Sequence, residues 1–187
     1  MQRAVRRILI LSAGVALPLS FAAYAAGEVG RYQTRAEFLL ESFGTEQPPT
    51  AVVWLDDELR QTATRVLGHP PAMLRVRYWY DGAKTAWIID EIGKEQAITF
   101  GIVIENAAIQ ALRVMEFRES RGWEIRYPFF TAQFAALQLN DRGALSRGID
   151  GISGATLSVK AATRSATLAL VLDEFTRRPK QQSNAAR

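Results

Sequence analysis

The sequence predicts an α+β fold, an antiparallel sheet of about four or more strands with helices packed on it. Between residues 74 and 117, apolar and polar residues alternate with a period of two, as they do in half-buried strands. On both sides of this region the composition or the apolar spacing is that of helices. A chain of 187 residues allows one domain with a real core plus short accessory segments.

Two amphipathic helices are expected before the sheet. The first covers residues 32–43 and closes at Gly44, and a linker follows at 45–49. The second covers residues 52–67, ends at Gly68 and is expected to pack on the sheet. We assign residues 28–73 to a helical accessory segment.

Four consecutive strands are expected at 74–80, 85–92, 98–104 and 109–117. Asp81 and Gly82 predict a hairpin turn between the first two, and Asn106 lies at the turn between the last two. In the second strand, Trp87 and Ile89 share one face of the sheet. These spacings predict an antiparallel meander.

After the strands, a polar break at 119–122 precedes an aromatic stretch, and a helix is expected over 129–139. A loop at 140–148 leads to a last helix at 157–178, which is rich in alanine and leucine. We place the main domain at 74–178. The polar residues 179–187 are expected to form a flexible tail.

The N-terminus has the pattern of an export segment. Arg3, Arg6 and Arg7 precede twenty uncharged residues, 8–27. An Ala-x-Ala site ending at Ala25 predicts cleavage, whereas the length of the uncharged run approaches that of a membrane span. Residues 1–25 are therefore a signal peptide or an N-terminal membrane anchor.

Charge and composition exclude several kinds of protein. Without residues 1–25 the chain has 20 basic and 19 acidic residues, so we expect no nucleic-acid partner. The sequence has no cysteine and one histidine, which excludes iron–sulfur clusters, attached c-type haem, thiol nucleophiles and a His/Cys zinc site. The histidine, His69, is expected to be an exposed residue of a proline-rich loop.

The most informative segment runs from Asp150 to Thr156, Asp-Gly-Ile-Ser-Gly-Ala-Thr, directly before the last helix. A Ser-Gly-Ala turn at a helix N-terminus directs unpaired N–H groups outward, where a phosphate is held well. The Thr156 hydroxyl could form a covalent ester with that phosphate. The alternative is an ordinary turn in which Ser153 or Thr156 caps the helix.

This run resembles the flavinylation motif of the FMN-binding domain family, Asp-x-x-Ser/Thr-Gly-Ala-Thr/Ser. Members include subunits of the sodium-pumping NADH:quinone oxidoreductase and the Rnf electron-transport complex, and a domain of nitrous-oxide reductase regulators. The resemblance covers roughly residues 74–176 and implies an FMN-binding domain-like fold. It implies that Thr156 carries covalent FMN through a phosphoester, made by a separate flavin transferase that uses FAD as donor.

The resemblance also implies roles for other residues. Asp150 would serve recognition by the transferase. Ser153, Gly154 and Ala155 would direct N–H groups at the ester. Lys160, one helical turn after Thr156, would help to neutralise the phosphate, although a solvated lysine is an equal alternative.

Residues 119–122 occupy the place of a Glu-Thr-Pro-Gly loop that lies against the flavin in many members. Only Glu119 and Gly122 match this pattern, and Ser120 and Arg121 depart from it. An arginine near the ring would favour the reduced, negatively charged flavin. Four aromatic residues follow in the sequence: Trp123, Tyr127, Phe129 and Phe130. We expect them to pack in the core, and the alternative is that they contact the flavin.

We therefore predict an electron-transfer flavoprotein exported to the periplasm, with residues 8–27 as a candidate inner-membrane anchor. It would relay electrons between protein partners that are expected to be membrane-bound, and it would not be an independent enzyme. Two alternatives remain, a non-redox binding module that holds a phosphorylated ligand at the same turn, and a flavin-dependent reductase of a small substrate.

Overall fold

The computed structural model describes residues 30–178 and confirms the α+β fold. Its six strands form one antiparallel sheet in the order β1-β6-β5-β4-β3-β2. The strands are β1 (Gly30–Arg31), β2 (Thr50–Trp54), β3 (Arg75–Asp81), β4 (Lys84–Ile92), β5 (Ala97–Glu105) and β6 (Ala108–Phe117). The helices are α1 (Arg35–Phe43), α2 (Asp57–Leu67), α3 (Pro128–Thr131), α4 (Thr156–Arg177) and the short 3₁₀ helices η1 (Trp123–Arg126) and η2 (Ala132–Phe134).

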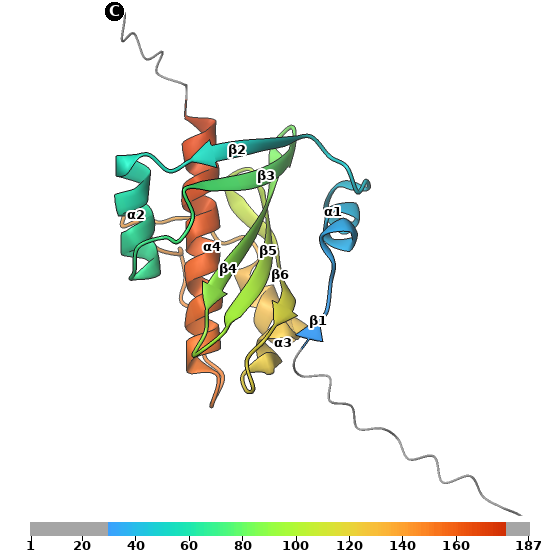
Figure 1. Ribbon diagram of the computed structural model, residues 1–187, viewed down its shortest axis with the longest axis vertical. Coiled ribbons are helices and arrows are strands. Elements are labelled where there is room, and N and C mark those ends of the chain that lie inside the picture. The colour runs from blue at the N-terminus through green and yellow to red at the C-terminus, as the bar shows by residue number, and fades with distance from the viewer. Residues whose placement is uncertain (1–29, 179–187) are drawn as a thin grey trace, which may run out of the picture.

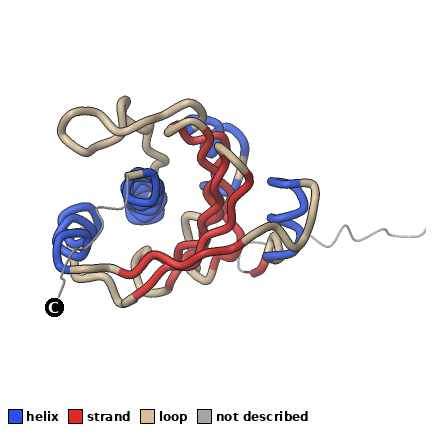
Figure 2. Tube along the Cα trace, turned by 90° about the horizontal axis from the view of Figure 1, so that it is seen from above, coloured by secondary structure: helices blue, strands red, loops and turns tan. Residues whose placement is uncertain are grey.

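The sheet separates two layers of helices (Figures 1 and 2). Helix α4 lies along the concave face of the twisted sheet beside α2, and α1 lies on the opposite face. Trp87 and Ile89 point toward α4 and are fully buried, as their spacing predicts. The other face packs a smaller cluster against α1, in which Phe38 and Trp79 are buried.

Two buried carboxylates fasten the sheet to α4. Asp173 accepts a hydrogen bond of 2.6 Å from the Thr85 hydroxyl and forms an ion pair with Arg177 at 2.7 Å. Glu91 pairs with Arg164 at 3.2 Å and with His69 at 3.1 Å. A buried charge is tolerated only when it is paired in this way. His69 is therefore partly buried in its loop, where we expected it to be exposed.

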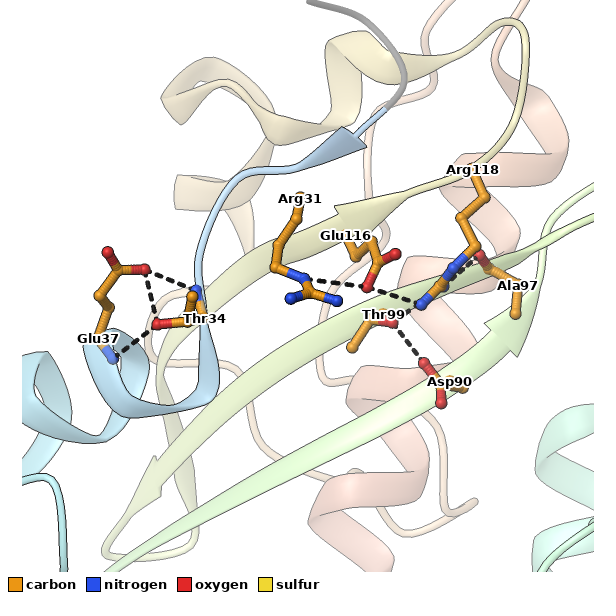
Figure 3. A network of polar contacts seen from close by, with 8 residues as sticks. All are labelled: Arg31, Thr34, Glu37, Asp90, Ala97, Thr99, Glu116 and Arg118. Atoms are coloured by element: carbon orange, nitrogen blue, oxygen red, sulfur yellow. Dashed lines mark hydrogen bonds and ion pairs between the residues drawn. The ribbon is translucent and has the colours of Figure 1, made fainter.

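The face of the sheet opposite α4 carries a polar network beside α1 (Figure 3). Arg118 donates to the Ala97 carbonyl at 2.8 Å and pairs with Glu116 at the same distance. Glu116 also pairs with Arg31 of β1 at 3.6 Å. These contacts attach the two-residue strand β1 to β6 and hold the end of β6 in place.

The hairpins are confirmed, with turns that match their residues. Asn106 and Ala107 both adopt positive φ, at 52° and 62°, as a two-residue turn of type I′ requires. Gly82 has φ 56° in the turn between β3 and β4. Trp79 and Trp87 of this hairpin are buried, whereas Tyr80 is exposed.

Two predicted helices differ from the structure. The helix expected from residue 52 begins at Asp57, where Asp56 caps it, and residues 50–54 form edge strand β2. The helix expected over 129–139 is short, because α3 and η2 end before Ala136, which has φ 62°. The chain then pairs with the start of β6, where the carbonyl of the buried Leu137 accepts a hydrogen bond from the Ile109 N–H at 2.8 Å.

The predicted export segment, 1–25, and the predicted tail, 179–187, lie outside the described residues. Within residues 30–178, no helix is both long enough and apolar enough to cross a membrane. The domain boundaries remain predictions.

Gly101 of β5 allows α1 to pack closely on the sheet. A Cβ atom there would lie 2.7 Å from the buried Phe38 ring and 2.9 Å from Met115 Sδ. We expect Gly101→Ala to lower the free energy of unfolding by about 1–3 kcal/mol, the usual cost of overpacking. Urea denaturation measures the change. The control is Gly148→Ala, where no atom lies within 4 Å and φ is not positive, and equal stability of the two variants would contradict the prediction.

Candidate functional site

The N-terminus of α4 has no side-chain cap. Ala155 occupies the capping position, so neither Ser153 nor Thr156 caps the helix. The backbone N–H groups of residues 156–158 have no acceptor among residues 30–178. The long helix therefore begins with three unsatisfied N–H donors at the positive end of its dipole, beside the side chain of the exposed Thr156.

The turn before α4 is anchored from inside. Ile149 and Ile152 pack against the core, while Asp150 and Ser153 are exposed. The backbone N–H of Asp150 donates to the Gln133 side chain at 2.7 Å. Gly154 has φ 83°, which a residue with a side chain rarely adopts. The fold thus fixes the backbone of the turn and leaves its polar side chains accessible.

A cavity of about 580 Å³ opens beside Thr156, within the size range of small-molecule sites. Three segments that are distant in sequence line it: Lys94, residues 119–121 and residues 154–158. The predicted site residues Glu119, Arg121, Gly154, Ala155 and Thr156 therefore meet at one place.

Four other predicted site residues do not line this cavity. Asp150 and Ser153 are exposed in the turn, and Lys160 is exposed on α4. Gly122 lies behind the cavity wall with φ 89°. A Cβ atom at Gly122 would be 2.5 Å from Ser158 Oγ, so only glycine lets this loop approach α4 so closely.

Glu119 organises the turn between β4 and β5. One oxygen of its buried carboxylate accepts hydrogen bonds of 2.5 to 2.9 Å from three successive N–H groups, those of Lys94, Glu95 and Gln96. Burial raises the pKa of this carboxyl, but the three hydrogen bonds and the charge of Lys94 outweigh burial and lower the pKa below its ordinary value of 4.5. Glu119 therefore holds the turn that carries Lys94.

The cavity has a positive character. Lys94 and Arg121 contribute two exposed cations, and the α4 dipole adds to them. Lys94 pairs with the exposed Glu95 at 2.9 Å, but Glu95 does not line the cavity, and the charge of Glu119 is already engaged by N–H groups. Lys94 was not among the residues that we selected from the sequence. The topology could have revealed it, because the turn between β4 and β5 lies at the same end of the sheet as the end of β6.

None of the four aromatic residues considered for flavin contact lines this cavity. Phe130 is fully buried and packs on Phe134, as expected for a core residue. Trp123 and Tyr127 pack around the Arg126 guanidinium, and Phe129 is exposed. Within residues 30–178, no cluster of three or more acidic or histidine side chains could hold a metal ion.

Residues 93–171 match the family model of the FMN-binding domain. The matched segment begins at the turn that carries Lys94, includes β5 and β6, and extends over most of α4. It thus contains every residue that lines the cavity. The match supports binding of FMN and a flavoprotein function. No curated protein matches the chain.

Glu119→Gln keeps the shape of the side chain and removes its charge. Because the folded pKa lies below the unfolded value, Glu119 contributes stability at pH above about 4.5 and loses it as pH falls through the folded pKa. We expect the variant to be less stable by about 1–2 kcal/mol at pH 7, and the difference to shrink at acidic pH.

Urea denaturation between pH 3 and pH 7 checks this expectation. The matched control is Glu95→Gln in the same turn, where the side chain is exposed and the change should remain within about 0.5 kcal/mol. A stability difference for Glu119→Gln that does not depend on pH would show that its charge does not hold the turn.

Proposed function

We propose that this protein is an exported electron-transfer flavoprotein that carries FMN covalently, through a phosphoester to Thr156. One observation carries the proposal. An exposed threonine hydroxyl lies at the uncapped N-terminus of a 22-residue helix and opens on a positively charged cavity, inside the segment that matches the FMN-binding domain.

The residues present fit a phosphoester at this place. The N–H groups of residues 156–158 are placed to donate to phosphate oxygens, and the helix dipole favours the negative charge of the ester. Gly154 and Ala155 have no bulky side chain that would keep the phosphate away. Lys94 and Arg121 add positive charge around the remainder of the cofactor and favour negative charge on it.

FMN would supply the transfer of one or two electrons. The polypeptide would hold the cofactor and tune its environment, and the absence of cysteine leaves no place for an iron–sulfur or attached c-type haem group. These features support a carrier that relays electrons between protein partners, and we propose that these partners are membrane-bound. Residues 1–25 support export to the periplasm, with residues 8–27 as a candidate anchor in the inner membrane.

We propose that a separate FAD-dependent flavin transferase makes the ester. The side chains that the motif singles out, those of Asp150, Ser153 and Thr156, are all exposed along one turn. A modifying enzyme can therefore reach them on the folded protein, without any unfolding of α4.

Thr156→Val should abolish covalent flavin, because it removes the hydroxyl and keeps the shape of the side chain. Stability should change by less than about 0.5 kcal/mol, since Thr156 is exposed. Intact mass spectrometry of exported protein, produced together with a flavin transferase, should show the added mass of FMN less one water on the parent and not on the variant.

Two controls keep this test specific. Thr176→Val, at the other end of α4, removes a hydroxyl from the same helix and should keep full labelling. His69→Ala removes the single histidine and should also keep it. Tandem mass spectrometry that places the flavin on His69 or on a tyrosine would overturn the proposed linkage.

Asp150→Ala should separate recognition from folding. The carboxylate is exposed and makes no hydrogen bond or ion pair with residues 30–178, so the melting temperature should hardly change. Flavin incorporation should fall sharply if the transferase reads this side chain. Labelling time courses measure the effect, Asp141→Ala in the preceding loop is the matched control, and equal rates for both variants would refute this role for Asp150.

A further inference from the structure

A second cavity, also of about 580 Å³, lies between α2, α4 and the loop at 142–145. It shares no lining residue with the cavity beside Thr156. Three arginines from three separate segments line it, Arg65 of α2, Arg142 of the loop and Arg164 of α4. Val66 and Val171 give it an apolar wall, and three threonines and residues 143–145 also line it.

The positive charge of this cavity is only partly neutralised. Among residues 30–178, no carboxylate lines it. Arg164 pairs with Glu91, Arg65 donates only to the Thr62 hydroxyl, and the Arg142 side chain makes no hydrogen bond or ion pair within the described part of the chain. Three guanidinium groups against one carboxylate leave two net positive charges, and a cleft with such walls concentrates anions.

The loop that carries Arg142 has a fixed conformation. The Asn140 side-chain oxygen accepts hydrogen bonds from the N–H groups of Arg142 and Ala144, at 2.9 and 3.1 Å. Its amide nitrogen donates to the Leu145 carbonyl at 3.2 Å. Gly143 supplies the left-handed residue of the turn, with φ 71°. This arrangement keeps the backbone of Arg142 at the edge of the cavity.

Glu91 fixes the third guanidinium. Its buried carboxylate holds one terminal nitrogen of Arg164 at 3.2 Å, and the other nitrogens of that group make no hydrogen bond with residues 30–178. A guanidinium that is oriented in this way retains donors for a second oxyanion. The Thr163 and Thr167 hydroxyls donate to main-chain carbonyls within α4, so the donors for an anion come from the arginines.

We propose that this cavity binds a small organic anion, with a carboxylate or phosphate group between Arg65, Arg142 and Arg164 and its apolar part against Val66 and Val171. Arg65 lies outside the segment that matches the FMN-binding domain. The site therefore depends on the N-terminal part of this chain and gives α2 a role. This proposal does not depend on the flavin that we propose at Thr156.

Isothermal titration calorimetry on the exported protein tests it with three probes: phenyl phosphate, phthalate and the uncharged benzyl alcohol. Saturable binding of either anion, without binding of the alcohol, is the expected result. Arg142→Gln and Arg65→Gln should each weaken binding about tenfold or more, the loss expected for a charge-assisted contact. Phenyl phosphate and phthalate distinguish a phosphate site from a carboxylate site.

The matched control is Arg60→Gln on α2, an equal change of charge outside the cavity lining, which should leave the affinity within about twofold. Nuclear magnetic resonance shifts should map to residues 62–66, 142–145 and 163–171. Absence of saturable binding at about 10 mM probe, equal affinities for Arg142→Gln and Arg60→Gln, or shifts confined to 154–158 would each overturn the proposal.

Discussion

The arrangement of this molecule depends on how closely α4 packs in the concave face of the sheet. Four alanines along the helix, Ala161, Ala162, Ala166 and Ala169, are fully buried, and their small side chains let the helix backbone approach the strands. The pairs Glu91–Arg164 and Asp173–Thr85 then fix how α4 lies along β4. Since α4 begins where β6 ends, the same packing brings Thr156 to the loop at 119–121.

The sequence predicted those parts of the fold that local patterns determine. Alternation along β3 to β6 and the turn residues Gly82 and Asn106 specify the hairpins without help from distant segments. Strand β2 was not predicted, because only Val53 of its five residues is buried. In addition, Val52, Leu55 and Leu59 lie at positions i, i+3 and i+7, which is the spacing of a helix face. The helix expected over 129–139 does not extend that far, because the backbone of Ala136 and Leu137 hydrogen-bonds with Ile109 of β6 instead. This pairing outweighs the helix propensity of these residues.

The candidate site likewise has residues that the sequence reveals and residues that only the fold brings together. Thr156 and its turn are visible in the sequence, because a glycine turn before a helix is a local signal. Lys94 and the close approach of Gly122 to Ser158 arise only when the meander and α4 have both formed. Glu119 was expected to lie against the flavin. It does line the cavity, but one of its oxygens is engaged with three backbone donors, so its main effect is on the shape of the site.

The left-handed Ala136 also protects the sheet from other chains. An unpaired strand edge is a template for aggregation, and an exposed edge on any of the long strands β4, β5 and β6 would favour it. Both flanks of β4 and β5 are paired, and the outer edge of β6 is covered by β1 at one end and by the chain at Ala136 and Leu137 at the other. Strand β2 leaves only a five-residue edge. The left-handed conformation of Ala136 thus helps to prevent strands of other molecules from pairing with the edge of this sheet.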